Sequence, residues 1–259
     1  MIDVGAWIGD YPFRPVPHPE PAVLVRVLER EGFAGAWVGH LPSAFWRDAH
    51  AGNAVLASGL APFPSVLRPT PVARPDWPGW ETVVDDAART GAPAVRAYPM
   101  QWGLSPDGAA MRALADRCAR RGRALLLTTR FEDGRQRHPM DQVPDLPAAA
   151  VRTLVRETNA SVVLTAAGRD GIEEIAWGLT DAERARIWFD CTWLWGPPDA
   201  HCAHLFATIG PERFVIATAW PLRLAQQARA LLALADPPPR APLADGAQIE
   251  AAAHARAIG

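Results

Sequence analysis

Short apolar runs alternate with helix-like segments along the whole chain, and this alternation restricts the fold more than any other feature. Eight runs have the length and composition of buried parallel strands, at residues 2–5, 35–38, 61–66, 94–97, 124–128, 161–165, 186–190 and 214–217. Helical patterns lie between them, for example at 21–31, 79–90, 108–121, 147–159 and 221–235. Eight such units in 259 residues predict an α/β protein with a single (β/α)8 barrel.

A proline-rich stretch near the C-terminus separates the barrel from a last helix. The sequence "ADPPPRAPLADG" fills residues 235–246, and a helical pattern follows at about 248–258. We therefore expect the barrel to span 1–236, and a connector with a C-terminal helix packed on the barrel to span 237–259.

Charge and hydropathy argue against several classes of partner. The net charge is −2 without a charge block, so a nucleic-acid surface is not expected. No apolar run approaches the ~20 residues of a membrane span. The three cysteines lie far apart, which favours reduced thiols in the cytoplasm. We expect a cytoplasmic protein with a small-molecule ligand, and homo-oligomerisation stays open.

The basic residues are all arginine. The chain has 26 basic side chains and no lysine. This composition excludes a lysine Schiff base and the lysine of a phosphate-binding loop. Acid–base chemistry must therefore come from carboxylate, histidine or tyrosine side chains.

The first strand, I-D-V-G-A-W, resembles the I-D-x-H-x-H start of the amidohydrolase-related barrels of the amidohydrolase 2 type. Three later stretches are similar to other landmarks of that family, in the same order: "ALADRCARRGRALLLTTR", "NASVVLTAAGRDG" and "IGPERFVIATAWPLR". This branch of the family includes decarboxylases and lactone hydrolases. The resemblance implies an amidohydrolase-like barrel over the whole chain.

The same resemblance indicates where metal ligands would lie. Their positions hold Gly5, Trp7, Thr128, Ala166 and Ala219, none of which offers the imidazole, thiolate or carboxylate that zinc binds. The position of the family's usual proton acceptor, Ala219, has no ionisable group either. The resemblance therefore implies a branch without the metal centre, and we expect no metal and no cofactor.

Active sites of such barrels lie at the C-terminal strand ends and the loops that follow them. Applied to this sequence, that rule predicts a substrate-binding set of Trp7, Arg14, His40, Asp48, His50, Arg96, Tyr98, Arg130, Arg135 and Trp220. The arginines would hold a carboxylate or phosphate, and the two tryptophans would form apolar walls. For Asp48 and His50, capping or facing solvent at a helix start is the alternative.

Three residues are the candidate proton carriers. Glu132 and His138 lie in the polar loop "TTRFEDGRQRHP", and Asp190 ends the seventh predicted strand. Both carboxylate and histidine can be tuned to exchange protons near neutral pH. The alternatives are a solvated loop held by internal salt bridges, and an aspartate that binds loop amides.

Two functional hypotheses follow. The first is a metal-independent enzyme that acts on a small anionic or polar molecule by hydrolysis, decarboxylation, elimination or isomerisation. The second is a non-catalytic barrel that binds a ligand or a partner protein. Acid, base and arginine side chains converging on one pocket would favour the enzyme, whereas a mouth filled by Trp7 and Trp220 would favour the binding protein.

Overall fold

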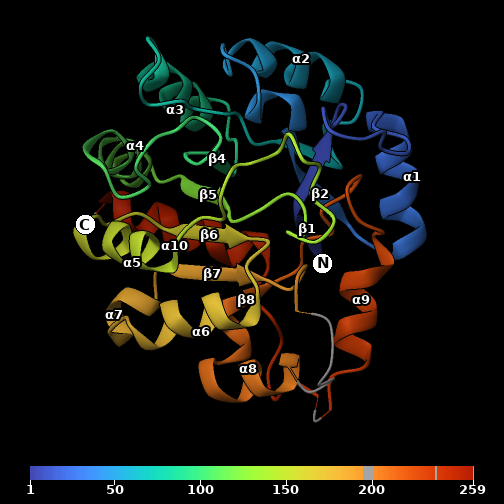
Figure 1. Cartoon of the computed structure of the whole chain (residues 1–259), viewed down its shortest axis with the longest axis vertical. Coiled ribbons are helices and arrows are strands. Elements are labelled where there is room, and N and C mark those ends of the chain that lie inside the picture. The colour runs from blue at the N-terminus through green and yellow to red at the C-terminus, as the bar shows by residue number, and fades with distance from the viewer. Residues whose placement is uncertain (195–200, 237, 259) are drawn as a thin grey trace.

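Parallel strands form the centre of the computed structural model, and helices surround them (Figure 1). The structure describes residues 1–194, 201–236 and 238–258. Within that part of the chain the strands are β1 (Ile2–Ile8), β2 (Gly35–His40), β3 (Leu67–Pro69), β4 (Ala94–Ala97), β5 (Ala124–Thr128), β6 (Val162–Thr165), β7 (Ile187–Asp190) and β8 (Phe214–Val215). The predicted (β/α)8 barrel is confirmed. Pro237 and Gly259, the ends of the expected C-terminal segment, lie outside the described residues.

The outer layer consists of helices, most of which turn an apolar face toward the strands. They are α1 (Pro21–Glu31), α2 (Ala51–Leu60), α3 (Trp80–Arg89), α4 (Ala109–Arg120), α5 (Ala148–Glu157), α6 (Arg169–Trp177), α7 (Asp181–Arg184), α8 (His201–Ile209), α9 (Gln226–Ala233) and α10 (Gly246–Ile258). Helix α1, for example, buries Leu24, Val27 and Leu28, which the helical period of 3.6 places on one face.

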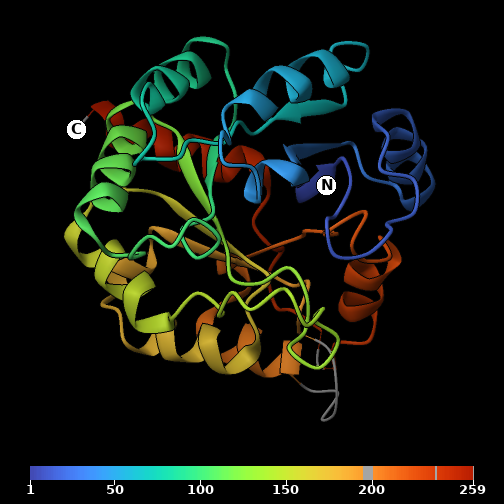
Figure 2. The same ribbon diagram turned by 45° about the horizontal axis from the view of Figure 1, so that its top comes forward.

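Backbone hydrogen bonds close the strands into a ring. The sheet assignments give β1-β2-β3 and β4-β5-β6-β7-β8 as two parallel sets. Val4 N donates to Ile216 O at 2.9 Å, which joins β1 to the segment after β8. Arg96 N donates to Pro71 O at 2.8 Å, which joins β4 to the segment after β3. Figure 2 shows the helices encircling this ring.

The third strand differs from the prediction. A strand over 61–66 was expected, but that expectation is wrong, because Leu67–Pro69 form β3 and the preceding residues form turns. Pro62 and Pro64 lack the N–H that a strand inside a parallel sheet donates. Leu67 N donates to Phe63 O at 2.9 Å, a turn bond rather than a ladder bond.

The helix expected over 221–235 begins later, at Gln226. Residues 221–225 instead form a turn, in which the amides of Leu222 and Arg223 both donate to Ala219 O, at 2.9 and 3.1 Å. This turn follows β8 and brings Arg223 toward the loops at the C-terminal ends of the strands.

Helix α10 covers the N-terminal end of the barrel. It contacts α4, β1 and β5, and in Figure 1 it lies behind the strands. Its Ile249 packs in one buried cluster with Ala94 and Ala124, the first residues of β4 and β5. In the described part of the chain, no helix is both long and apolar enough to cross a membrane.

Candidate active site

A buried aspartate joins the first and last strands inside the barrel. Asp3 Oδ1 accepts hydrogen bonds from the amides of Gly5 and Thr218 at 2.9 and 3.0 Å, and Oδ2 accepts from Thr218 Oγ1 at 2.6 Å. Burial raises the pKa of Asp3 above its ordinary value, although these bonds favour the ionised form. Asp3 was not predicted as a site residue; a carboxylate inside an apolar first strand was the available signal.

Arg96 places a cation at the centre of the barrel. It is fully buried, and its Nε donates to Thr70 Oγ1 at 2.7 Å. Its guanidinium lies 5.0 Å from the ring centre of Trp7. Burial lowers the pKa of Arg96, and Tyr98 and Asp3 oppose that shift. The interior of the barrel therefore holds a charged network as well as apolar packing.

Asp190 is the second buried carboxyl group of this network. Its Oδ1 accepts from Ala166 N at 2.9 Å and from Thr192 N at 3.3 Å. The Thr192 hydroxyl lies 2.7 Å from Asp190 Oδ2 and 2.9 Å from Ala217 O. A hydroxyl has a single hydrogen, so both contacts are hydrogen bonds only if the carboxyl group carries a proton. Burial raises the pKa of Asp190 to about 7, in agreement with that count.

An aromatic layer caps the network at the C-terminal ends of the strands. Trp7 Nε1 donates to Tyr98 OH at 3.1 Å, and the Trp7 ring lies 5.9 Å from that of Phe131. The Phe131 ring also contacts Tyr98 at 5.5 Å and Phe45 at 5.2 Å. Trp7, Tyr98 and Phe131 are buried. This layer, named here the aromatic cap, separates the barrel centre from the loops.

A pocket of about 250 Å³ lies at the mouth, in the loops that follow β1 and β5. It is lined by Tyr11, Phe13, Arg14, Glu132, Gln136, Arg137, His138 and Pro139. We call it the rim pocket. It brings together three predicted site residues, Arg14, Glu132 and His138.

Glu132 is the buried carboxylate of the rim pocket. Arg14 reaches its Oε1 with Nε at 2.8 Å and with Nη2 at 2.6 Å. Nη2 of Arg223 lies 3.9 Å from the other oxygen, and the Arg223 guanidinium lies 3.7 Å from the ring centre of Trp193. The carboxylate is thus held between two arginines that come from opposite ends of the chain.

His138 lies at the solvent side of the rim pocket. Its exposed ring stacks on Phe13 with centroids 5.9 Å apart, and its Nδ1 accepts from Met140 N at 3.2 Å. In the neutral ring this bond leaves the proton on Nε2, which can serve as a donor. Beneath it, Tyr11 OH donates to Asp141 Oδ2 at 3.1 Å.

Three predicted site residues near β2, namely His40, Asp48 and His50, do not line the rim pocket. Asp48 is exposed and accepts from the amides of His50 and Ala51 at 3.1 and 3.2 Å, at the start of α2. His50 Nε2 accepts from Arg74 N at 2.9 Å. His40 is buried, and its Nδ1 lies 2.9 Å from Ser43 Oγ.

Three further predicted residues do not line the rim pocket. The Arg135 side chain is 80% exposed and pairs with Asp133 at 2.9 Å. Arg130 pairs with Asp145 at 2.9 Å and lies over the Trp193 ring. Trp220 is buried in a separate cluster with residues of α1, β1 and β2, so it does not fill the mouth.

Arg137 lines the rim pocket and Asp141 lies next to Arg137; neither residue was predicted. Arg137 Nη2 lies 2.6 Å from Asp145 Oδ1, and its Nε lies 4.0 Å from Asp141 Oδ2. Both residues belong to the long polar loop after β5, whose pairing no sequence spacing reveals.

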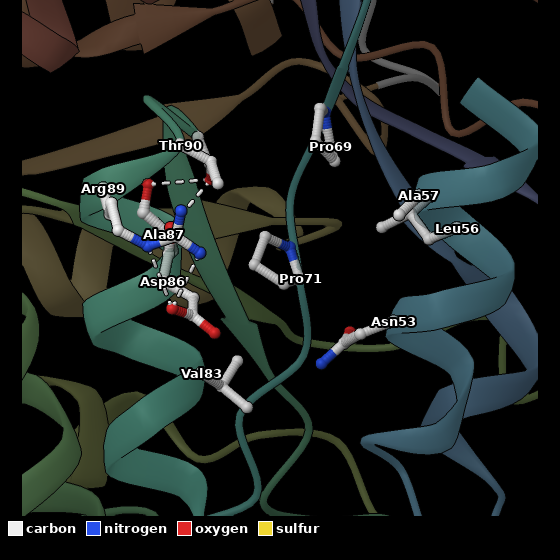
Figure 3. A pocket seen from close by; sticks show the side chains of 11 residues that line it. Asn53, Leu56, Ala57, Pro69, Pro71, Val83, Asp86, Ala87, Arg89 and Thr90 are labelled. Atoms are coloured by element: carbon white, nitrogen blue, oxygen red, sulfur yellow. Dashed lines mark hydrogen bonds and ion pairs between the residues drawn. The ribbon is translucent and has the colours of Figure 1, made fainter. Parts of the chain in front are cut away.

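A second pocket, of about 280 Å³, lies between α2 and α3 on the outer wall of the barrel (Figure 3). Its polar groups already have partners. Asn53 exchanges hydrogen bonds with the backbone of Val72 at 2.9 and 2.8 Å, and Arg89 pairs with Asp86 at 3.1 Å. No histidine lines this pocket, and its apolar wall offers no proton carrier beyond that one paired carboxylate.

Comparison with solved structures agrees with the fold. The chain superimposes on the 5-carboxyvanillate decarboxylase of Sphingomonas paucimobilis with a TM-score of 0.66 and 12% identity, covering 99% of this chain and 97% of that one. A protein solved as amidohydrolase II gives a TM-score of 0.67 and 14% identity, covering 96% and 99%. A probable 2-pyrone-4,6-dicarboxylic acid hydrolase of Acinetobacter baumannii gives 0.63 and 11%, covering 89% and 90%.

The chain has the amidohydrolase barrel fold. At these identities the likeness concerns the fold alone. No protein-family model matches the sequence, and no curated protein matches it either.

The residues at the positions where the sequence resemblance would place metal ligands do not fit a metal centre. Trp7 is buried in the aromatic cap, and Thr128 Oγ1 bonds Thr165 Oγ1 at 3.1 Å. Ala166 and Ala219 take left-handed backbone conformations, with φ of 59° and 54°, and carry only a methyl group. Among the described residues, no group of three or more histidine, cysteine, aspartate or glutamate side chains could hold a metal ion.

Gly5 cannot accept any side chain without a shift of its neighbour. A Cβ built on Gly5 would lie 2.5 Å from Ala217 Cβ. We expect Gly5→Ala to lower the free energy of unfolding by about 1–3 kcal/mol, as overpacking does. Urea unfolding of Gly5→Ala, Ala217→Gly and the double variant measures this; the second change should restore part of the loss.

Gly134→Ala is the matched control for that substitution. Nothing lies within 4 Å of a Cβ at Gly134, and its backbone φ is not in the left-handed range. We expect this change to be neutral or slightly stabilising. A Gly5→Ala protein as stable as Gly134→Ala would show that the first strand tolerates a side chain there.

Proposed function

We propose that the protein is an enzyme that acts on a small anionic or polar molecule by carboxylate and histidine acid–base chemistry, without a metal centre. The observation that carries this proposal is the convergence of Glu132, His138, Arg14 and Arg137 on the rim pocket. The pocket lies at the end of the barrel where enzymes of this fold place their active sites.

The two candidate proton carriers have complementary surroundings. Glu132 is buried, so its carboxylate is shielded from water and suits the role of general base. His138 is exposed with Nε2 available, which suits a general acid that exchanges its proton with solvent. Arg14 and Arg137 would fix the anionic group, because a guanidinium can pair with two oxygens at once. Hydrolysis, decarboxylation, elimination and isomerisation all use such a set.

The solved structures of the same fold support a small acidic substrate. Two of them are named as a carboxyvanillate decarboxylase and a pyrone dicarboxylic acid hydrolase. A third neighbour is a 2,6-dihydroxybenzoate decarboxylase in complex with 2,6-dihydroxybenzoate. The arginines of the rim pocket would suit a ligand with the same negative charge.

A non-catalytic, ligand-binding barrel is the second candidate. The aromatic cap favours it, because the buried Trp7 ring separates the barrel centre from the rim pocket and confines that pocket to the loops. A binding protein needs the arginines but not the proton carriers. The two candidates therefore differ in what Glu132 and His138 do.

The test is turnover of a panel of small carboxylic acids and lactones, followed by NMR, with protein dialysed against a chelator and without. We expect activity that survives the chelator. Glu132→Gln and His138→Asn should each reduce it by about 100-fold or more, as loss of a general acid or base does. Arg89→Gln, on the outer wall and paired with Asp86, is the control and should leave turnover unchanged.

Two results would contradict the proposal. If acids raise the melting temperature but none is converted, the protein is the binding barrel. If a substrate is converted at the same rate by Glu132→Gln and His138→Asn, the rim pocket is not the active site.

A further inference from the structure

The two side chains of the Arg14–Glu132 ion pair differ in their exposure to solvent. The Arg14 side chain is 40% exposed, whereas that of Glu132 is 6% exposed. Arg14 belongs to the loop after β1 and Glu132 to the loop after β5, so their ion pair joins the two loops, beside the Tyr11–Asp141 hydrogen bond and the Phe13–His138 stack. A molecule that enters the rim pocket from solvent meets the cation first.

The three guanidinium nitrogens of Arg14 already have hydrogen-bond acceptors in this structure. Nε and Nη2 both contact Glu132 Oε1, Nη2 also donates to Leu222 O at 3.0 Å, and Nη1 donates to Pro15 O at 3.3 Å. A ligand carboxylate that binds side by side with a guanidinium needs Nε and an Nη together. In Arg14 that edge is occupied by Glu132. A ligand anion can reach it only by displacing the glutamate.

The other arginines differ in how firmly they are held. Arg137 donates to Val143 O and Glu132 O and pairs with Asp145 at 2.6 Å, so a network within its own loop holds it. Arg223 stacks on Trp193 and lies 3.9 Å from the second oxygen of Glu132. A Glu132 that loses Arg14 therefore keeps a cation nearby, and the displacement does not leave a buried charge without any partner.

We propose that Glu132 occupies the anion site of Arg14 in the free protein, and that a small carboxylate or phosphate displaces it. The displaced carboxylate is then no longer bonded to Arg14, so its oxygens can contact the bound molecule and accept a proton from it, while Arg223 stays nearby. Ligand binding and activation of the base become the same event. The base role rests on the proposed function, whereas the displacement itself does not.

The test measures the affinity of acetate, succinate and inorganic phosphate by calorimetry. Removing the competing charge should strengthen binding, so we expect Glu132→Gln to bind these anions about tenfold more tightly or better. Arg14→Gln should weaken binding by a similar factor, and the double variant should match Arg14→Gln. The three anions show whether the site prefers carboxylate or phosphate. Arg89→Gln should match the wild type.

A measurement on the unaltered protein covers the case in which Glu132→Gln fails to fold. The ¹⁵Nε–¹H signal of Arg14, assigned by its loss in Arg14→Lys, should shift during the titration and saturate at the calorimetric affinity. An Arg14 signal that does not move while the anion binds would overturn the proposal. Unchanged or weaker binding by Glu132→Gln would do the same.

Turnover measured together with anion affinity in Glu132→Gln distinguishes this inference from the proposed function. Tighter anion binding with lost turnover in Glu132→Gln supports both. Tighter binding with retained turnover supports the displacement and removes Glu132 as the base. Unchanged binding with lost turnover supports the base and contradicts the displacement.

Discussion

Replacing Trp7 with alanine is expected to lower the free energy of unfolding by about 3–5 kcal/mol, the usual cost of removing a large core aromatic side chain. Trp7 is 1% exposed, contacts Phe131 and donates a hydrogen bond to Tyr98. Its ring also lies against the buried guanidinium of Arg96. The substitution therefore removes apolar packing, a hydrogen bond and a cation–π contact together.

Urea unfolding followed by circular dichroism is the measurement. Trp177→Ala is the matched control, because that tryptophan is 59% exposed on α6 and should change stability by no more than about 0.5 kcal/mol. If Trp7→Ala costs no more than the control, the aromatic cap does not stabilise the barrel. The rim pocket would then lie over a loosely packed centre.

Strands were predictable where an apolar run was free of proline. The predicted runs at 94–97 and 124–128 coincide with β4 and β5, since a buried parallel strand admits few polar residues. The run at 61–66 is just as apolar, but two prolines remove its donors and the strand forms after them. Hydropathy alone does not show that a proline lacks the backbone N–H that a strand donates.

The loops of the rim pocket were predictable, but most of their contacts were not. Parallel strands end at a common edge, so Arg14 after β1 and Glu132 after β5 were expected at the same face. Their pairing at 2.6 Å joins residues 118 positions apart, which no spacing rule predicts. Arg135 lies in the same loop but pairs with Asp133, two residues away, since a local turn fixes its direction.

The buried polar network was the least predictable part. Thr70 and Thr218 read as ordinary strand-end residues, yet each bonds a buried charged group, Arg96 and Asp3 respectively. Asp190 was predicted as a proton carrier, and among the described residues its hydrogen bonds go to Ala166 and Thr192 rather than to His138. Which side chains meet inside a barrel depends on how neighbouring strands are aligned. A single sequence does not give that alignment.

The protonation of Asp190 has a large consequence for stability. Its pKa is about 7 in the folded protein against an ordinary value of 3.8, because burial disfavours the charged form. Between these values the folded state holds a proton that the unfolded state has released. Stability is therefore greatest below about pH 4 for this group and falls as the pH rises to about 7, by on the order of 4 kcal/mol. Above about pH 7 this contribution is lost, because Asp190 is ionised in both the folded and the unfolded state, and the stability no longer changes with pH through this group.

Asp190→Asn isolates this effect from other titrating groups. The amide is isosteric with the protonated acid, keeps an oxygen for the amides of Ala166 and Thr192, and leaves the Thr192 hydroxyl free to donate to Ala217 O. Asp3, whose pKa burial also raises, adds a slope of the same sign to both proteins. Urea unfolding from pH 4 to pH 8 should show the wild type losing stability relative to Asp190→Asn until about pH 7. A difference that stays constant over this range would mean that Asp190 is ionised in the folded protein, and that Thr192 bonds only one of its two neighbours.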